Sequence, residues 1–492
     1  YPAADHEGKA LRPSYVIGKL KRIFPNMESI STIVGDGEAM DLIGPPLPSF
    51  NYLIGFLRNL ANNEKDANLW KDVYLWFSQK QEWQDKLKHV AAGLRYTNDE
   101  RPLAKEKVSK LYGSTYNSSV SRLERYASCP FSYYVQYGLR AKERKVLKLE
   151  APDIGSFLHL VISRFSEGLK RNNLSWKHVD EAWCRAEIDK IIEEILESIP
   201  GLPFRRSKRY IYLQERLKKV VTRSIWLIAE HVKKSGFEPV AYEMAFGEAD
   251  GLPAITLELP TGEKIVLKGR IDRIDILKTQ KGTYVRVIDY KSGAKEFKLS
   301  DVYNGIELQL ITYLSAIWEK GLKGAGGTYM PAGILYFKLD DPVLRIDGKK
   351  PPENIEDKLK KAMRMKGLVL ADKEIITEMD RDIKGDSLII PAGITKDGSL
   401  SSRSSAATVE QFERLRNHVK ETLVKLSAEM FTGNISISPY KRKKYISCTY
   451  CPYSSVCKFE GETNSYRLIG DMKDEEVWSL LGKKEEKKIS LQ

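Results

Sequence analysis

The residues with the clearest chemical potential in this sequence are two aspartates and a lysine on neighbouring predicted strands. Asp289 and Lys291 are two residues apart within 287–293, so in a β-strand their side chains point to the same face. Asp272 lies in the preceding segment, 269–275, across a turn rich in Lys, Gln and Gly. Paired carboxylates can hold Mg²⁺, and an ammonium group beside the cation can act on the attacking water. This constellation indicates metal-dependent phosphodiester hydrolysis.

Further candidate residues flank these strands. His159 lies on an apolar-faced helix predicted for 155–169, and it becomes a metal candidate only in the context of the two aspartates. Glu243 is one more acidic residue that could lie near the metal. Gln309 and Tyr313 are four residues apart on a predicted helix, so they share one face and could position DNA or the lysine. The simpler alternatives are a histidine with a packing role and a polar helix N-terminus.

The cysteines form a second candidate site. Cys448, Cys451 and Cys457 follow a Cys-x₂-Cys-x₅-Cys pattern, and three closely spaced thiolates need a fourth ligand to complete a soft-metal site. Cys129 is the best candidate, because Cys129 and Cys451 are each followed directly by proline. Zinc and an iron–sulfur cluster both suit such thiolates. Disulfides are not expected in a cytosolic protein, and Cys184, in a helical pattern, is expected to be a buried structural thiol.

The chain is basic, with 80 Lys and Arg against 66 Asp and Glu, a net charge of +14 and a pI of about 9.2. Such a charge favours polyanionic partners. The run of Lys441, Arg442, Lys443 and Lys444 is a candidate for phosphate contacts, and a solvated loop is the alternative. The chain contains no Gly-x-x-x-x-Gly-Lys-Ser/Thr sequence, so ATP binding by a P-loop is not expected.

The hydrophobic patterns predict helices first and strands later. Helices are expected at 15–24, 69–94, 119–137, 155–169, 179–236, 308–318 and near 475, and a Thr408-Val-Glu-Gln411 capping box opens one that ends near 431. Strands are expected at 255–259, 264–277, 283–290 and 332–338. Few strong signals fall in 366–407, which we expect to be a partly mobile insertion.

The length of 492 residues predicts about three domains. We expect a helical region at 1–115, a catalytic domain at 116–460 and a charged C-terminal tail at 461–492. No run of roughly 18 uncharged apolar residues predicts a membrane span. Without a signal-peptide pattern, and starting at Tyr rather than Met, the chain is expected to be a piece of a longer cytoplasmic protein.

Taken together, the candidate residues resemble the RecB-type branch of the PD-(D/E)xK nucleases. The matching motifs, in order, are Gly155-x-x-x-His159, Glu243, Gly269-x-x-Asp272, Asp289-Tyr-Lys291 and Gln309-x-x-x-Tyr313. Each motif is weak alone, and the ordered set is specific. The resemblance implies an α/β, restriction-endonuclease-like core in which a mixed central sheet is flanked by helices. It implies that His159, Asp272 and Asp289 bind Mg²⁺, that Lys291 acts on water, and that Gln309 and Tyr313 support DNA positioning.

The cysteine pattern narrows the resemblance to the iron–sulfur nuclease domain of the AddB family, the partner of AddA in bacterial helicase–nucleases. The segment Ser121–Phe131 is also similar to the AddB segment that leads into the nuclease. The resemblance implies that Cys129, Cys448, Cys451 and Cys457 bind a [4Fe–4S] cluster as a clasp. Residues 1–115 would then be the end of a helicase-like region.

The resemblance implies a Mg²⁺-dependent DNA exonuclease that works in double-strand-break repair and recombination. It would act on single-stranded and double-stranded DNA, cleave the 5′-ended strand and form a heterodimer with an AddA-type helicase–nuclease subunit. A free-standing Cas4-like or Dna2-like iron–sulfur exonuclease is one alternative. A non-catalytic DNA-binding subunit is another, and the intact set of Asp272, Asp289 and Lys291 argues against it.

Overall fold

The computed structural model of the chain describes fourteen stretches of the sequence. They are residues 11–27, 39–58, 67–94, 96–98, 101–142, 144, 151–198, 208–248, 251–293, 295–322, 327–342, 355–443, 445–461 and 463–489. The chain divides into two compact units, residues 1–97 and residues 98–492, and each unit is described by itself.

The first unit is helical in its described residues. Its elements are α1 (Tyr15–Ile23), the 3₁₀ turn η1 (Ala39–Leu42), α2 (Pro46–Arg58), α3 (Ala67–Gln79) and α4 (Gln81–Leu94). Helices α2, α3 and α4 share a small core of large apolar residues, namely Phe50, Leu53, Phe56, Trp70, Phe77, Trp83 and Leu87. The ring of Phe50 lies 5.0 Å from that of Phe77 in an edge-to-face contact. The span predicted as one helical region, 69–94, is thus a pair of helices.

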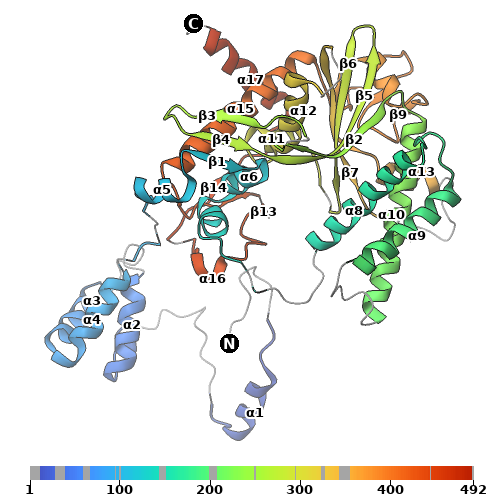
Figure 1. The fold of residues 1–492 in the computed structure, drawn as a ribbon. Coiled ribbons are helices and arrows are strands. Elements are labelled where there is room, and N and C mark those ends of the chain that lie inside the picture. Colours follow the sequence, from blue (N-terminus) through green and yellow to red (C-terminus); the bar gives the residue numbers. More distant parts are fainter. Residues whose placement is uncertain are drawn as a thin grey trace. The chain divides into compact units, whose positions relative to one another are not determined.

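A six-stranded mixed sheet organises the second unit (Figure 1). Its strands, in spatial order, are β11 (Ala406–Ala407), β8 (Lys366–Leu370), β7 (Tyr329–Lys338), β6 (Gly282–Lys291), β5 (Gly269–Thr279) and β2 (Glu238–Phe246). The pairs β6–β7 and β8–β11 are parallel, and the other pairs are antiparallel. Strand β6 is buried along most of its length, as expected for a central strand whose two faces are both covered.

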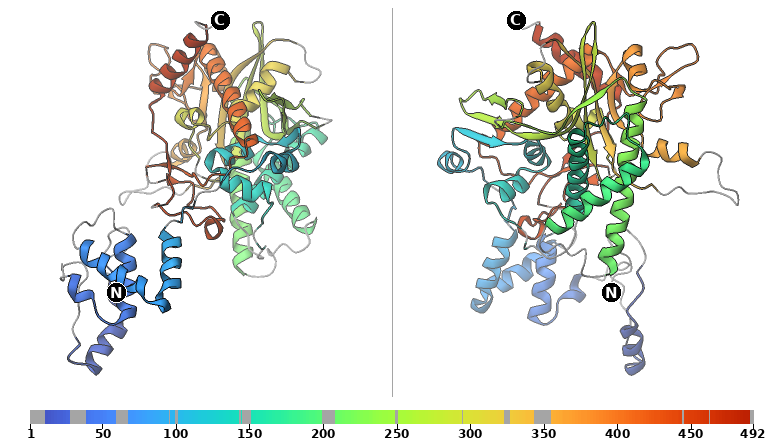
Figure 2. Two further views of the ribbon diagram at one scale, coloured as in Figure 1. Left: turned by 90° about the vertical axis from the view of Figure 1, so that its left-hand side faces the viewer. Right: turned by 45° about the vertical axis from the view of Figure 1, so that its right-hand side comes forward.

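Helices cover both faces of this sheet (Figure 2). Helix α12 (Gln309–Lys320) packs on β6 and β7, and α15 (Val409–Phe431) packs on α12. On the opposite face, His231 of α10 (Lys208–Lys233) contacts the ring of Phe337, and α8 (Ala151–Arg171) and α9 (Glu181–Ser198) pack with α10. The predicted fold class, a mixed sheet flanked by helices, is confirmed.

The remaining elements of the second unit are short, apart from α17. The helical ones are α5 (Lys105–Tyr112), α6 (Val120–Ser128), α7 (Pro130–Tyr133), the π-helical η3 (Tyr134–Gly138), α11 (Leu299–Tyr303), α13 (Ile355–Ala362), α14 (Lys373–Met379), α16 (Ser454–Cys457) and α17 (Asp474–Ile489). One small sheet holds β1 (Thr115–Ser118), β4 (Lys264–Leu267) and β3 (Ile255–Glu258). A second holds β13 (Tyr445–Ile446), β12 (Tyr440–Arg442) and β14 (Arg467–Leu468), and a two-stranded ribbon pairs β10 (Gly393–Ile394) with β9 (Gly385–Asp386).

Two sequence predictions need correction. The single strand expected at 264–277 is broken at Lys268, and its halves, β4 and β5, belong to different sheets. The expected insertion at 366–407 contributes β8 and β11 to the central sheet, because its short apolar runs pair with β7 and with each other. Such two- to five-residue strands leave little periodicity in a sequence.

The C-terminal segment is more than a charged tail. Helix α17 packs on α15 and α11, and its Val477 and Leu481 are buried in the main core. By contrast, the capping box predicted at Thr408 is present in full. The Gln411 amide N–H donates to Thr408 Oγ1 at 3.2 Å, and the Thr408 N–H donates to Gln411 Oε1 at 2.9 Å.

Within the described residues, no helix combines the length and the apolar character that crossing a membrane requires.

Candidate active site

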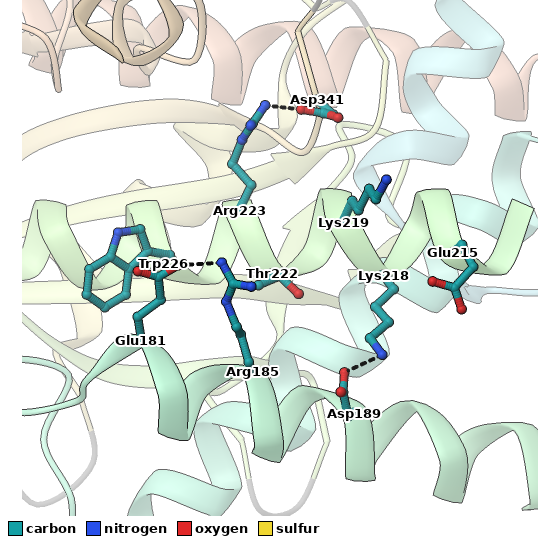
Figure 3. Close-up of a pocket in the computed structure, with 10 residues that line it drawn as sticks. All are labelled: Glu181, Arg185, Asp189, Glu215, Lys218, Lys219, Thr222, Arg223, Trp226 and Asp341. Carbon is teal, nitrogen blue, oxygen red and sulfur yellow. Dashed lines mark hydrogen bonds and ion pairs between the residues drawn. The ribbon is translucent and has the colours of Figure 1, made fainter. Parts of the chain in front are cut away.

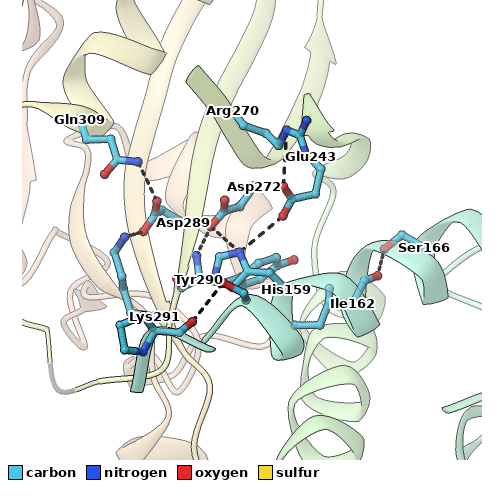
Figure 4. A network of polar contacts seen from close by, with 12 residues as sticks. His159, Ile162, Ser166, Glu243, Arg270, Asp272, Asp289, Tyr290, Lys291 and Gln309 are labelled. Atoms are coloured by element: carbon cyan, nitrogen blue, oxygen red, sulfur yellow. Dashed lines mark hydrogen bonds and ion pairs between the residues drawn. The ribbon is translucent and has the colours of Figure 1, made fainter. Parts of the chain in front are cut away.

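A hollow of about 970 Å³ lies where α8, β2, β5, β6 and α12 converge. The polar side chains that line it include Arg270, whose Nε lies 4.0 Å from Glu243 Oε2, and the predicted residues His159, Glu243, Asp272, Asp289, Lys291 and Gln309 (Figure 4). The structure therefore brings together residues that are up to 150 positions apart in the chain. Tyr313 lies one helical turn beyond Gln309, and the Gln309 Nε2 donates to its hydroxyl at 2.9 Å.

Three of these side chains form a group with metal-ligand spacing. The ligand atoms of His159, Glu243 and Asp272 all lie within 4.8 Å of one another. His159 Nδ1 is 3.4 Å from Glu243 Oε1 and 3.6 Å from Asp272 Oδ2. Oxygen ligands with one imidazole suit a hard divalent cation that is bound at the rim of a polar hollow.

The Tyr290 peptide orients two members of this group. His159 Nε2 is 3.0 Å from the Tyr290 carbonyl oxygen, and because a carbonyl only accepts, Nε2 carries the proton and Nδ1 faces the carboxylates. The Tyr290 N–H donates to Asp272 Oδ2 at 2.7 Å. One residue of the Asp289-Tyr-Lys291 motif thus fixes, through its backbone, both the histidine ring and the carboxylate on the neighbouring strand.

Glu243 reaches the group through an unusual backbone conformation. It lies within β2, yet its φ of 46° is in the left-handed region that L side chains rarely adopt. On either side of it, Tyr242 pairs with Arg273 and Met244 pairs with Ile271. Strain of this kind gathers at functional sites, where the surrounding structure holds it in place. The sequence suggested Glu243 only as a possible neighbour, since no residue pattern marks a strained position inside a strand.

Asp289 and Lys291 form the other side of the site. Both residues point to the same face of β6, and Lys291 Nζ makes an ion pair with Asp289 Oδ2. Gln309 Nε2 approaches Asp289 Oδ1 at 3.4 Å from the first turn of α12. The Lys291 ammonium also lies 5.6 Å from the ring centre of Tyr336, the residue of β7 that pairs with Asp289 of β6. Asp289 is therefore held from two directions.

The electrostatics of the site favour a bound cation. Burial and the charge of Asp272 raise the pKa of Asp289 to about 6, and Lys291 opposes this rise. Burial alone would lower the pKa of His159, but hydrogen bonds to Asp272 and Glu243, together with their charges, raise it to about 10. Without metal, the imidazolium supplies the positive charge that these carboxylates require. The donor set and its excess negative charge fit Mg²⁺.

The opposite face of the same two strands carries a different ionic cluster. Asp275 accepts hydrogen bonds from Arg273 Nε at 2.6 Å and from Arg286 Nε at 2.9 Å, and all three side chains are buried. Burial alone would raise the pKa of Asp275, but the two guanidinium groups hold it below its ordinary value. Burial and the same two arginines lower the pKa of His231 to about 3, so its imidazole is neutral.

The glycine that opens the Gly269-x-x-Asp272 motif has a steric role. A Cβ atom at Gly269 would lie 2.5 Å from the ring of Phe246 and 3.2 Å from the Tyr313 hydroxyl. The first residue of β5 must therefore lack a side chain for Phe246 and Tyr313 to pack beside the site.

The four cysteines of the predicted clasp line one small cavity, with Phe131, Ile437, Tyr453 and Phe459 among its walls. Cys129 precedes α7, and Cys457 ends α16. Burial and the charges of Cys129, Cys451 and Cys457 raise the pKa of Cys448 to about 11, but the four sulfur atoms do not form a group within 4.8 Å of one another in the described residues. Cys184 lies buried in α9, as expected.

The basic run beside the clasp is largely engaged in contacts within the chain. Arg442 pairs with Asp301, and its Nε lies 3.7 Å from Asp471 Oδ1. Lys443 Nζ is 2.7 Å from Asp471 Oδ2, although its side chain is 76% exposed. The Lys441 ammonium lies over the ring of Tyr466. Lys444, the fourth residue of the run, lies outside the described residues.

A second hollow, of about 490 Å³, lies between α9 and α10 (Figure 3). Its charged side chains compensate one another. Arg185 pairs with Glu181 at 2.6 Å, Lys218 pairs with Asp189 at 2.9 Å, and Arg223 pairs with Asp341. This balance contrasts with the excess of carboxylates in the first hollow.

Comparison with known families assigns the class of the protein. Residues 117–458, the larger part of the chain, match the PD-(D/E)XK nuclease superfamily. The chain therefore belongs to the PD-(D/E)XK nuclease superfamily, and the expected enzyme class is confirmed. In addition, residues 35–93 match the ATP-dependent helicase/deoxyribonuclease AddB fifth domain, which confirms the resemblance to AddB.

Curated relatives extend this likeness over nearly the whole chain. It is 48% identical over 488 residues to an ATP-dependent helicase/deoxyribonuclease subunit of Acetivibrio thermocellus, a match that covers 98% of this chain and 43% of that protein. The corresponding protein of Ruminiclostridium cellulolyticum is 47% identical over 486 residues, covering 98% of this chain and 42% of that protein. That of Clostridium novyi is 45% identical over 491 residues, covering 99% and 43%. The chain thus spans less than half the length of these relatives.

Proposed function

We propose that this chain is a Mg²⁺-dependent deoxyribonuclease that hydrolyses phosphodiester bonds in DNA. The observation that carries the proposal is the arrangement of Asp272 and Asp289 on paired strands, with His159 and Glu243 on one side and Lys291 on the other. A non-catalytic DNA-binding subunit would not require all of these groups around one hollow.

The proposed roles follow from the geometry. His159, Asp272 and Asp289 would hold Mg²⁺. His159 and Asp272 belong with Glu243 to the group of closely spaced ligand atoms, and Asp289 lines the same hollow. When bound, the cation would neutralise the scissile phosphate and lower the pKa of an attacking water. Lys291, whose ammonium lies against Asp289, is placed to orient that water or to stabilise charge that develops on the phosphate.

Gln309 and Tyr313 complete the catalytic set that we propose. The Gln309 amide reaches both Asp289 and the Tyr313 hydroxyl, so it can hold the carboxylate in one orientation. Gln309 lines the hollow and can support the positioning of DNA directly, whereas the buried Tyr313 would act through its hydrogen bond with Gln309.

The decisive test is cleavage of end-labelled single-stranded DNA in the presence of Mg²⁺. We expect Asp289→Asn to lower the rate by at least roughly 100-fold, since losing even an outer-shell metal partner costs ~10–100-fold. Asp397→Asn, in an exposed loop, is the matched control and should leave the rate unchanged. Wild-type activity in Asp289→Asn would refute the proposed site.

We also propose that the chain works within a cytoplasmic helicase–nuclease complex that processes double-strand breaks for recombinational repair. The AddB match at residues 35–93 and the names of the relatives, each a helicase/deoxyribonuclease subunit, support this proposal. They favour a heterodimer with an AddA-type subunit over a free-standing Cas4-like or Dna2-like exonuclease. Single-stranded and double-stranded DNA would be the substrates, and the 5′-ended strand would be the one cleaved.

Strand choice is testable in the reconstituted complex. With ATP and a duplex labelled on either strand, Asp289→Asn in this subunit should protect the 5′-ended strand and leave the other strand degraded. Protection of the 3′-ended strand instead would reverse the proposed polarity. Failure to co-purify with an AddA-type ATPase would favour the free-standing alternative.

For the clasp we propose a [4Fe–4S] cluster held by Cys129, Cys448, Cys451 and Cys457. This proposal is supported by the small cavity that the four cysteines share, with aromatic and aliphatic residues in its walls. Because the ligands come from distant segments, the centre would stabilise the folded chain by restricting the unfolded one.

Protein purified without oxygen should be brown, and Cys451→Ser should lose both the visible absorbance and part of its resistance to heat. Cys184→Ser, which lies outside the clasp, is the matched control for colour. A colourless protein that contains stoichiometric zinc would replace the cluster with the alternative metal.

The basic residues Lys441, Arg442, Lys443 and Lys444 are proposed to contact DNA phosphates near the clasp. Lys443 supports this role best, because its side chain is the most exposed of the three in the described part of the run. Arg442, held by Asp301 and Asp471, would act mainly by shaping the loop.

A further inference from the structure

Helix α12 delivers Gln309 to the site, yet it begins without a capping side chain of its own. The residue at its N-cap is Leu308, which has no polar side-chain atom. The first N–H groups of a helix have no partner within the helix and need acceptors from elsewhere. The start of α12 must therefore be fixed by another part of the chain.

Glu124 supplies the missing acceptor from α6. Its Oε1 accepts the Leu308 N–H at 2.6 Å and the Gln309 N–H at 3.0 Å. The two positions are more than 180 residues away in sequence, so the contact depends on the tertiary fold. A carboxylate at a helix N-terminus is also favoured by the helix dipole.

Burial and nearby groups act in opposite directions on the charge of Glu124. Burial raises the pKa of Glu124 to about 7, while the Leu308 N–H and the charge of Lys295 oppose the rise. Lys295 itself pairs with the buried Glu307 at 2.7 Å, immediately before α12. The favourable contacts of the partly buried Glu124 therefore include the first N–H groups at the start of α12.

Gln309 connects this cap to the reacting groups. Its backbone N–H is bound by Glu124, and its side-chain amide reaches Asp289 Oδ1 and the Tyr313 hydroxyl. A change in the backbone position of Gln309 would move its amide relative to Asp289. Displacements of about 1 Å at such positions are enough to lower turnover strongly.

We propose that Glu124 is a positioning residue of the nuclease, which sets the place of Gln309, and through it of Asp289, by capping α12 from a different helix. This inference rests on the proposed function. It extends the site to α6, which also precedes the clasp residue Cys129 and whose Arg125 lies 3.9 Å from Cys451 Sγ. The rival explanation is that Glu124 contributes only to stability.

The conservative variant separates these explanations. Both N–H groups donate to the same oxygen, so Glu124→Gln keeps an acceptor in place, whereas Glu124→Ala removes it. At pH 8 and saturating DNA and Mg²⁺, we expect Glu124→Ala to lower kcat by ~10–100-fold with little change in KM. Glu124→Gln should retain most of the activity.

A double variant tests whether Glu124 acts through Gln309. If it does, Glu124→Ala combined with Gln309→Ala should have the same kcat as Gln309→Ala alone, within about twofold. Multiplication of the two losses would overturn the inference.

The matched control is the cap of α14, a helix that contributes no residue to the hollow. Asp372 accepts the Glu374 N–H at 2.8 Å and the Ile375 N–H at 3.3 Å, as Glu124 does at α12. Asp372→Ala should reduce thermal stability and leave kcat unchanged. If Asp372→Ala and Glu124→Ala lose the same stability and also the same fraction of kcat, Glu124 has only a structural role.

Amide hydrogen exchange at Leu308 and Gln309 keeps the two proposals distinguishable. Wild-type protein that fails to cleave DNA would refute the proposed function. Faster exchange in Glu124→Ala would still show that Glu124 fixes the start of α12, and unchanged exchange would refute the inference.

Discussion

The two faces of the β5–β6 pair contain similar residue types and behave in opposite ways. On one face, Asp275 is matched by two arginines, and the nearby His231 is neutral. On the other face, Asp272 and Glu243 lie beside His159, whose pKa is raised to about 10, and Asp289 pairs with Lys291 in the same hollow. The first cluster is buried and has one more guanidinium group than carboxylate, and the second has more carboxylates than lysine and arginine side chains around an open hollow.

The surroundings of a buried carboxylate decide whether its role is structural or ligand-binding. Charged side chains that are buried and hydrogen-bonded to one another, as Asp275 is to Arg273 and Arg286, link neighbouring strands. Glu243, Asp272 and Asp289 instead lie beside an open hollow, where burial and the repulsion between Asp272 and Asp289 favour a bound cation. Asp272 and Arg273 are adjacent in β5 yet belong to different clusters, because successive side chains of a strand point to opposite faces of the sheet.

The largest expected effect comes from removing the carboxylate of the buried cluster around Asp275. Asp275→Asn leaves two buried guanidinium groups without their carboxylate, which should lower the free energy of unfolding by about 3–5 kcal/mol. Asp382→Asn removes the partner of Lys234 in an exposed ion pair and should change it by less than about 1 kcal/mol. Urea unfolding of both variants measures the difference. Equal effects would mean that burial does not distinguish the two pairs.

On the face that carries Asp272 and Asp289, removing a carboxylate should increase stability instead of lowering it. In metal-free protein at pH 8, Asp289→Asn removes a buried charge that is repelled by Asp272, so the free energy of unfolding should rise by on the order of 1 kcal/mol. Added Mg²⁺ should stabilise the wild type and not the variant. Thermal unfolding with EDTA or Mg²⁺ reports both effects, and destabilisation of Asp289→Asn in EDTA would contradict the comparison.

A pH dependence sharpens the comparison further. The pKa of Asp289 is raised from 3.8 to about 6, so its ionisation destabilises the metal-free fold, and that stability should decline as pH rises from about 4 through 6. Mg²⁺ needs ionised Asp289 and unprotonated His159, so its affinity should instead increase with pH, with release of about one proton at pH 7.5. Calorimetry in two buffers of different ionisation enthalpy counts that proton. Binding without proton release would place His159 outside the metal site.

Sequence reasoning predicted the parts of the molecule that leave local patterns. The strand pattern in 283–290, the Thr408 capping box and the spacing of Gln309 and Tyr313 all reflect geometry within a few residues. The mixed sheet flanked by helices could therefore be predicted, as could the face shared by Asp289 and Lys291.

Features that depend on distant contacts could not be predicted. The strained backbone of Glu243, the cap that Glu124 provides for α12 and the short strands β8 and β11 arise from tertiary packing. The ion pairs of Arg442 and Lys443 likewise come from acidic residues outside the basic run, so composition alone overstated the free positive charge there.

The left-handed turn of the backbone at Glu243 has a practical consequence for engineering. Transplanting this site onto another scaffold would take more than copying its side chains, because an ordinary strand residue at that position would aim its carboxylate elsewhere. A designer would have to reproduce the left-handed backbone at Glu243 together with the backbone of Tyr290, which bonds to His159 and Asp272. The transplanted unit would therefore have to include the backbone of these strands as well as their acidic side chains.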